Sequence, residues 1–167
     1  MSEEEALTNF ARWEPPHGSF QLNYPWKHYL EIGKVTRQCA YRIEELHNCI
    51  ISKIQGQSDF IKIIQDACME LSKESGITLQ ELSAAVKQMT YPKAAPTHIK
   101  NLKKTAANLK IVLKTVTLEN ANVLEDVMPG AMVASLLVDI VECIEDIAES
   151  VIELAHLAKF KGADLAS

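Results

Sequence analysis

The sequence MVASLLVDIVECIEDIAESVIELAHLAK, residues 132–159, decides the fold of this chain. Its apolar residues recur at alternating steps of four and three, the pattern of a helix that packs lengthwise against other helices. The seam that this pattern defines consists of Leu137, Ile140, Ile144, Ile147, Val151 and Leu154. Two interpretations of the seam stay open. Either it is the spine of a helical bundle within one chain, or it pairs with a second copy of the chain.

Helix-breaking residues divide the rest of the chain into shorter amphipathic segments. Proline and glycine interrupt the pattern at residues 15–18 and 92–96, and Gly56 and Gly76 end two further segments. Thr78 and Glu81 have the spacing of a capping box at a helix start. No stretch shows the strict alternation of a strand. The predicted helices cover residues 3–13, 26–55, 59–73, 79–89, 97–117 and 130–161. The sequence therefore predicts an all-α fold, a bundle of about five to six helices with a long, heptad-patterned C-terminal helix.

The composition is that of a globular domain. The chain has 167 residues, of which 47% are hydrophobic and 23% charged, which sets it apart from disordered and disulfide-scaffold classes. A formal net charge of −5 argues against non-specific binding of nucleic acid. The longest uncharged stretch near the C-terminus, residues 127–138, is well short of the roughly 20 residues needed to cross a bilayer.

Two other features indicate the compartment. The first residues, Met-Ser-Glu-Glu-Glu, are acidic, whereas a secretory signal is basic and then apolar. Four cysteines without a CxxC pair stand among apolar residues, as buried thiols do in a reducing compartment. We therefore expect a soluble segment in the cytosol.

The charges are segregated along the chain. No acidic residue occurs between Glu81 and Glu119, a stretch that contains seven lysines, whereas the helix predicted over 130–161 is rich in Asp and Glu. The lysine-rich helix could attract anions or an acidic membrane face. The alternative, which we favour, is a solvated face partly neutralised by the neighbouring acidic helix.

The sequence holds no phosphate-binding loop, dinucleotide-binding glycine motif, serine-hydrolase elbow or zinc-protease motif. Two Glu-x-x-His pairs, Glu44 with His47 and Glu153 with His156, have the ligand spacing of carboxylate-bridged di-metal bundles. Both pairs flank the apolar pattern, and the helix predicted over 97–117 has no carboxylate to bridge two metals. We therefore expect no enzyme and no cofactor or metal site, and a di-metal redox bundle stays as an alternative.

The N-terminal part carries a family resemblance. Residues 10–18, FARWEPPHG, are followed by Tyr24-Pro25-Trp26 and by residues 37–42, RQCAYR. This series resembles the plant aluminium-activated malate transporter family, in which a Trp-Glu-Pro motif marks the segment just after the transmembrane helices. Stretches within residues 69–76 and 134–161 resemble later parts of the family in the same order.

The resemblance implies the cytosolic half of a malate-permeable anion channel, located at a membrane's cytosolic face, the plasma membrane rather than the vacuolar one. Residues 1–25 would form the post-membrane helix and Trp-Glu-Pro loop, 26–161 the cytosolic helical bundle, and 162–167 a tail. The implied partners are the transmembrane half of the same channel and a second copy in a homodimer, with no nucleic acid. Malate or other anions would act at the pore, which this chain does not contain.

In this interpretation the domain couples cytosolic signals and dimerisation to the pore, because packed helices have discrete arrangements that can bias an attached pore. The gating candidates are Trp13, Glu14, Pro15, Trp26 and Arg37, together with the seam. A free-standing helical adaptor that binds partner helices through the same seam is the other alternative.

Overall fold

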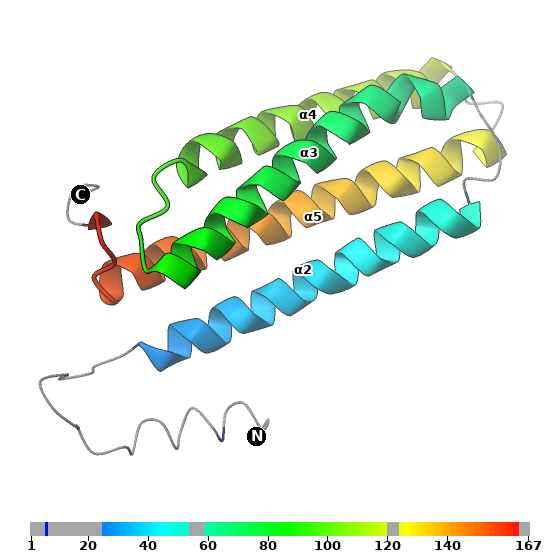
Figure 1. Ribbon diagram of the computed structural model, residues 1–167. Helices are drawn as coiled ribbons and strands as arrows, with labels where there is room; N and C mark the ends of the chain where they lie inside the picture. Colours follow the sequence, from blue (N-terminus) through cyan, green and yellow to red (C-terminus); the bar gives the residue numbers. More distant parts are fainter. Residues whose placement is uncertain (1–5, 7–24, 54–58, 120–123, 164–167) are drawn as a thin grey trace, which may run out of the picture.

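The computed structural model describes Ala6 and residues 25–53, 59–119 and 124–163 (Figure 1). Of the helix predicted over 3–13, only Ala6 is described, and it is helical. The Trp13-Glu14-Pro15 motif lies outside the described residues.

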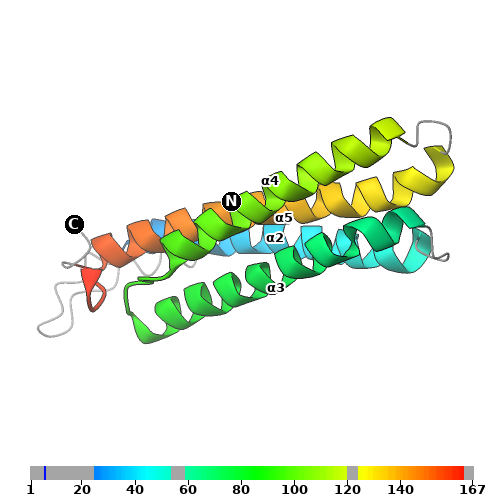
Figure 2. The same ribbon diagram turned by 90° about the horizontal axis from the view of Figure 1, so that it is seen from above.

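Four long helices in up-and-down order make up most of the described residues. They are α2 (Trp26–Lys53), α3 (Asp59–Gln88), α4 (Ala95–Glu119) and α5 (Leu124–Leu157). Figures 1 and 2 show each of them running antiparallel to the next one in the chain. Within the described ranges the closest approach to a strand is an isolated parallel bridge between Thr90 and Lys161. The predicted all-α fold is confirmed.

Helix α3 is one continuous element where the sequence predicted two helices, over 59–73 and 79–89. The predicted capping box is wrong, because the Thr78 hydroxyl donates a hydrogen bond of 2.8 Å to the Glu74 carbonyl within the same helix. Ser75 and Thr78 are buried. A glycine inside a helix costs about 1 kcal/mol relative to alanine. The packing of α3 against both α4 and α5 outweighs that cost at Gly76.

Helix α5 begins at Leu124, whereas the sequence predicted a start at residue 130, after Pro129. Proline lacks the N–H group that donates to the carbonyl four residues earlier. Pro129 is the sixth residue of α5, so the missing bond concerns the Glu125 carbonyl in the first turn. The helix therefore loses a hydrogen bond near its end and not in its packed middle.

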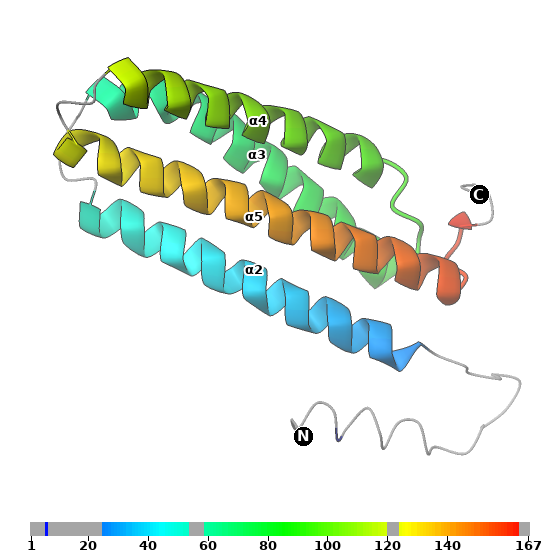
Figure 3. The same ribbon diagram turned by 180° about the vertical axis from the view of Figure 1, so that it is seen from behind.

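The core is built around α5. This helix packs against α2, α3 and α4, and α3 and α4 also pack against each other. Figure 3 shows α5 between α2 on one side and the α3–α4 hairpin on the other. Among the described residues, no Cα atom of α2 comes within 8 Å of one in α3 or α4. Among the described helices, α5 is thus the one against which α2 packs along its length.

Candidate functional site

The predicted seam forms the centre of this core. All six seam residues are between 0 and 4% exposed, and they are covered by the other helices of the same chain. These residues are Leu137, Ile140, Ile144, Ile147, Val151 and Leu154. The seam thus packs within the chain, and three of its residues, Leu137, Ile147 and Val151, also line pockets between α2 and α3.

Two of the predicted gating residues, Trp26 and Arg37, belong to the described part of the chain, and they lie apart on α2. Trp13, Glu14 and Pro15 lie outside the described residues. Trp26 is the first residue of α2 and is 38% exposed, and its ring centroid lies 6.1 Å from that of Tyr29. Arg37 is exposed on the same helix, eleven positions later and hence about 16 Å along the axis.

Trp26 instead stands beside a cluster that the sequence did not predict. At the end of the bundle where α2 begins and α5 ends, Leu154, Ala155 and Phe160 are buried together, and Tyr29 and Tyr91 pack against them. We call these five residues the junction cluster. It joins the first turn of α2, the α3–α4 loop and the end of α5, which are far apart in the sequence.

Two backbone hydrogen bonds hold the α3–α4 loop to the segment after α5. The N–H of Tyr91 donates to the Lys161 carbonyl at 3.1 Å, and the N–H of Lys161 donates to the Met89 carbonyl at 3.0 Å. The chain turns sharply on both sides of this contact, with positive φ angles at Met89, Lys159 and Gly162. The ring of His156 adds an edge-on contact to Tyr91, with centroids 5.3 Å apart.

A second polar cluster clamps α3 to the start of α4. One carboxylate oxygen of Glu81 accepts a hydrogen bond of 3.0 Å from the Ala94 N–H, at the N-terminus of α4. The other lies 3.4 Å from His98 Nε2, while Glu74 Oε2 lies 3.8 Å from His98 Nδ1. The histidine thus stands between two carboxylates of α3. The seven-residue spacing of Glu74 and Glu81, which places both on one helix face, was the available sequence signal.

The lysine-rich helix α4 and the acidic helix α5 pack against each other. Lys103 on α4 pairs with Glu145 on α5. The other lysines of α4 that are described in full, Lys100, Lys104, Lys110 and Lys114, are exposed. This arrangement supports the interpretation of a solvated basic face that the acidic helix partly neutralises.

The two Glu-x-x-His pairs are not brought together. Glu44 and His47 are exposed on α2, while Glu153 lies 4.0 Å from His28 and its partner His156 contacts Tyr91. In the described part of the chain, no group of three or more His, Cys, Asp or Glu side chains is arranged to hold a metal ion.

The four cysteines are free thiols, of which Cys39 and Cys49 are buried, as expected, whereas Cys68 and Cys143 are half-buried. Burial raises the pKa of Cys39 to about 11, with a smaller contribution from Cys143, and burial also raises the pKa of Cys68 to about 11. These thiols are therefore protonated, and weak nucleophiles, near neutral pH.

Among the helices described, none is both long and apolar enough to span a membrane.

Comparison with known proteins shows to which family the sequence is similar. Residues 1–124 match the family described as aluminium activated malate transporter.

Relatives align over almost the whole chain. It is 41% identical over 165 residues to aluminum-activated malate transporter 1 of Arabidopsis thaliana, an alignment that covers 96% of this chain and 32% of the relative. The identity to aluminum-activated malate transporter 2 of the same plant is 42% over 165 residues, again 96% and 32% of the two chains. Aluminum-activated malate transporter 1 of Triticum aestivum is 34% identical over 167 residues, covering 96% and 35%. The chain thus spans about a third of the length of these relatives.

Proposed function

Since this chain belongs to the aluminium-activated malate transporter family, whose members are membrane transporters and not enzymes, we propose that it is the cytosolic regulatory and assembly domain of a malate-permeable anion channel. Its immediate partner is the transmembrane half of the same channel. The domain lies at the cytosolic face of the membrane, the plasma membrane rather than the vacuolar one. Malate and other anions act at the pore and not in this bundle.

The observation that carries this proposal is the packing at the start of α2. The first turn of α2 packs into the junction cluster with the end of α5. A displacement of the start of α2 therefore acts on the α3–α4 loop and on α5 at one place. Packed helices move between discrete arrangements, so a cytosolic signal that shifts the bundle can bias the attached pore, and the pore can be biased in turn.

Assembly into a homodimer belongs to the same proposal. The buried seam holds the four helices of one chain together. It thereby fixes the exposed helix faces through which a second copy would bind. Contact between two copies then takes place on exposed surface, with the seam intact in each.

The test is anion current through the intact channel that contains this domain. We expect Trp13→Ala and Phe160→Ala to change the voltage or malate dependence of the current at equal surface expression. Tyr41→Ala is the matched control, because Tyr41 is an aromatic residue of α2 that is 67% exposed and outside the junction cluster. Unchanged currents in both test variants, at unchanged expression, would refute the coupling.

A further inference from the structure

None of the four described helices covers the face of the bundle between α2 and α3. In an antiparallel four-helix bundle each helix packs against two neighbours, but α2 packs against α5 alone within the described residues. The sides of α2 and α3 that face each other across α5 are therefore left without a backbone neighbour. Figure 2, seen from above, shows α2 and α3 on the same side of the α4–α5 pair.

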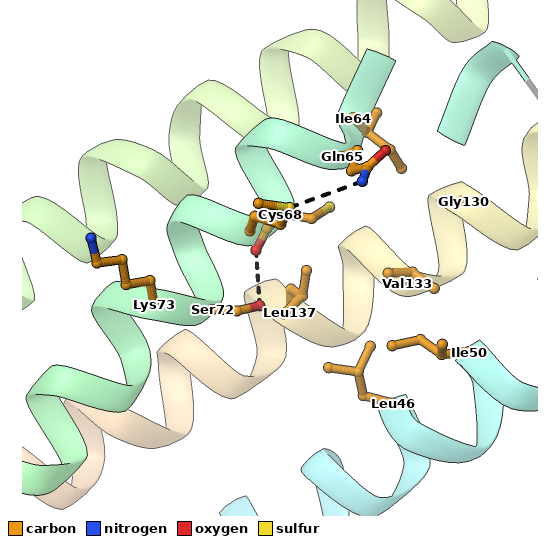
Figure 4. A pocket seen from close by; sticks show the side chains of 11 residues that line it. Leu46, Ile50, Ile64, Gln65, Cys68, Ser72, Lys73, Gly130, Val133 and Leu137 are labelled. Carbon is orange, nitrogen blue, oxygen red and sulfur yellow. Dashed lines mark hydrogen bonds between the residues drawn. The ribbon is translucent and has the colours of Figure 1, made fainter. Parts of the chain in front are cut away.

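Two pockets lie in line on this face. The first has a volume of about 460 Å³ and is lined by Leu46 and Ile50 of α2, by Val133 and Leu137 of α5, and by α3 around Cys68 (Figure 4). The second, of about 380 Å³, is lined by Ile32 of α2, by Leu82 and Val86 of α3 and by Ile147 and Val151 of α5. We call the two together the α2–α3 groove.

The dimensions of the groove match one helix. The two pockets lie along α5 at Val133 and Leu137 and at Ile147 and Val151, and together they span eighteen positions or about 27 Å at 1.5 Å per residue. Between them Ile140 and Ile144 are buried. Large apolar side chains at the edges of the groove are exposed, with Ile50 at 43% and Met69 at 60%. These exposed side chains offer apolar contacts to a partner, and methionine adapts its shape to the partner that it contacts.

The charges of the groove indicate the chemistry of its partner. Among the described residues that line the two pockets, the charged ones are Lys73 and Lys87, both on α3. They are fourteen positions apart, four turns, and so lie on nearly the same face of α3. Figure 4 shows the Lys73 side chain at the edge of the pocket and directed away from its apolar lining. Each pocket thus combines an apolar floor with a cation at its edge.

We propose that the α2–α3 groove binds an amphipathic helix of a partner protein that carries acidic side chains four turns apart. Apolar side chains of that helix enter the two pockets and contact the exposed Ile50 and Met69 at the edge of the first one, in the helix-in-groove manner. Its two carboxylates pair with Lys73 and Lys87 and set the register. This binding role is separate from the proposed channel coupling, because it concerns a different face of the bundle from the junction cluster.

The test uses the full 167-residue chain and two designed peptides, each an amphipathic helix of about 18 residues. One peptide carries Glu at two positions fourteen residues apart, and the other carries Lys there. Binding is followed by calorimetry and by protection of Cys68, which lines the first pocket, from a thiol reagent. The reagent is applied above neutral pH, because the raised pKa of Cys68 makes this thiol a weak nucleophile near pH 7. Cys143, which does not line either pocket, is the internal control.

We expect the acidic peptide to protect Cys68 and to bind about 5-fold or more tightly than the basic one, as two partly exposed ion pairs allow. The double variant Lys73→Glu/Lys87→Glu should reverse that preference. Lys104→Glu, an exposed lysine of α4 outside the groove, is the matched control and should leave it unchanged.

Three results would overturn the proposal. Protection by neither peptide would mean that the groove binds no helix. Equal affinity for the two peptides would remove the role of the lysines. Protection of Cys68 that increases with protein concentration alone, or with an anionic detergent alone, would assign the groove to a second copy or to an amphiphile. A change in channel gating tests only the proposed coupling, so the two proposals can fail separately.

Discussion

Burial of Leu154 stabilises the end of the bundle by an amount that can be predicted from a matched pair of substitutions. Leu154 and Leu157 are three residues apart near the end of α5, and they are 0% and 51% exposed respectively. Leu154→Ala and Leu157→Ala make the same chemical change and the same change in helix propensity. The difference between the two variants therefore isolates the effect of packing.

We expect Leu154→Ala to lower the free energy of unfolding by about 3 kcal/mol, within the range of 2–5 kcal/mol for a fully buried leucine. Leu154 packs with Phe160, Tyr29 and Tyr91 in the junction cluster, so the cavity has walls from three segments that cannot easily collapse into it. For a chain of this size the thermal midpoint falls by about 6–12 °C. Leu157→Ala should change stability by less than about 0.5 kcal/mol.

The assay is equilibrium unfolding of the 167-residue chain in urea, followed by the circular dichroism signal of the helices. The dependence of the free energy of unfolding on urea concentration, the slope, is compared first, and the free energies in water are compared after it. Equal slopes show that both variants unfold from comparably compact states. If the two variants lose stability to within about 1 kcal/mol of each other, the packing assigned to Leu154 is wrong.

Three further measurements test local features. Gly162→Ala should destabilise the fold by about 1 kcal/mol or more, because φ is +92° at this position. Gly76→Ala should stabilise α3 by up to about 1 kcal/mol, because the added Cβ has open space around it. If both variants shift the thermal midpoint in the same direction, the backbone conformation assigned to one of the two glycines is wrong. Glu81→Ala removes the acceptor for the Ala94 N–H and should lower the free energy of unfolding by about 1–2 kcal/mol. Glu81→Gln keeps an amide oxygen that can accept this hydrogen bond, so its loss of stability should be smaller. If the two variants lose the same stability, Glu81 does not cap α4. Burial raises the pKa of the Cys39 thiol from 9.0 to about 11. The unfolded chain therefore loses this proton at lower pH than the folded one, and the free energy of unfolding falls as the pH rises from 9.0 towards 11. The fall should be smaller in Cys39→Ala. Identical plots of stability against pH for this variant and the unchanged chain would argue against a buried thiol.

The sequence predicted the parts of the fold that depend on periodic apolar residues. The seam from Leu137 to Leu154 is buried as its spacing indicated, because the a/d pattern repeats over several turns and leaves one face to bury. Helix ends were predicted less well. Gly76 and Pro129 have strong local preferences against helix, and tertiary packing outweighs those preferences in α3 and α5.

The junction cluster and the α3–α4 clamp could not be read from the sequence in the same way. Tyr29, Tyr91 and Phe160 come from segments far apart in the chain, and only the antiparallel arrangement places them together. Glu81 did carry a capping signal, but it caps α4 through the Ala94 N–H and not the predicted helix at 79. A capping residue can serve a neighbouring helix as well as its own, and local spacing does not distinguish the two.

The way the helices are joined suggests how movement would pass through the domain. The α3–α4 hairpin behaves as one body, since Glu74 and Glu81 hold His98 and the start of α4. Helix α2 is a second body that reaches the hairpin through α5 and through the junction cluster. A helix bound in the α2–α3 groove would connect the two bodies along their length and restrict their relative movement. A partner in the groove would therefore fix the position of α2 against the hairpin, whereas the proposed coupling to a pore acts through the junction cluster at the other contact of α2.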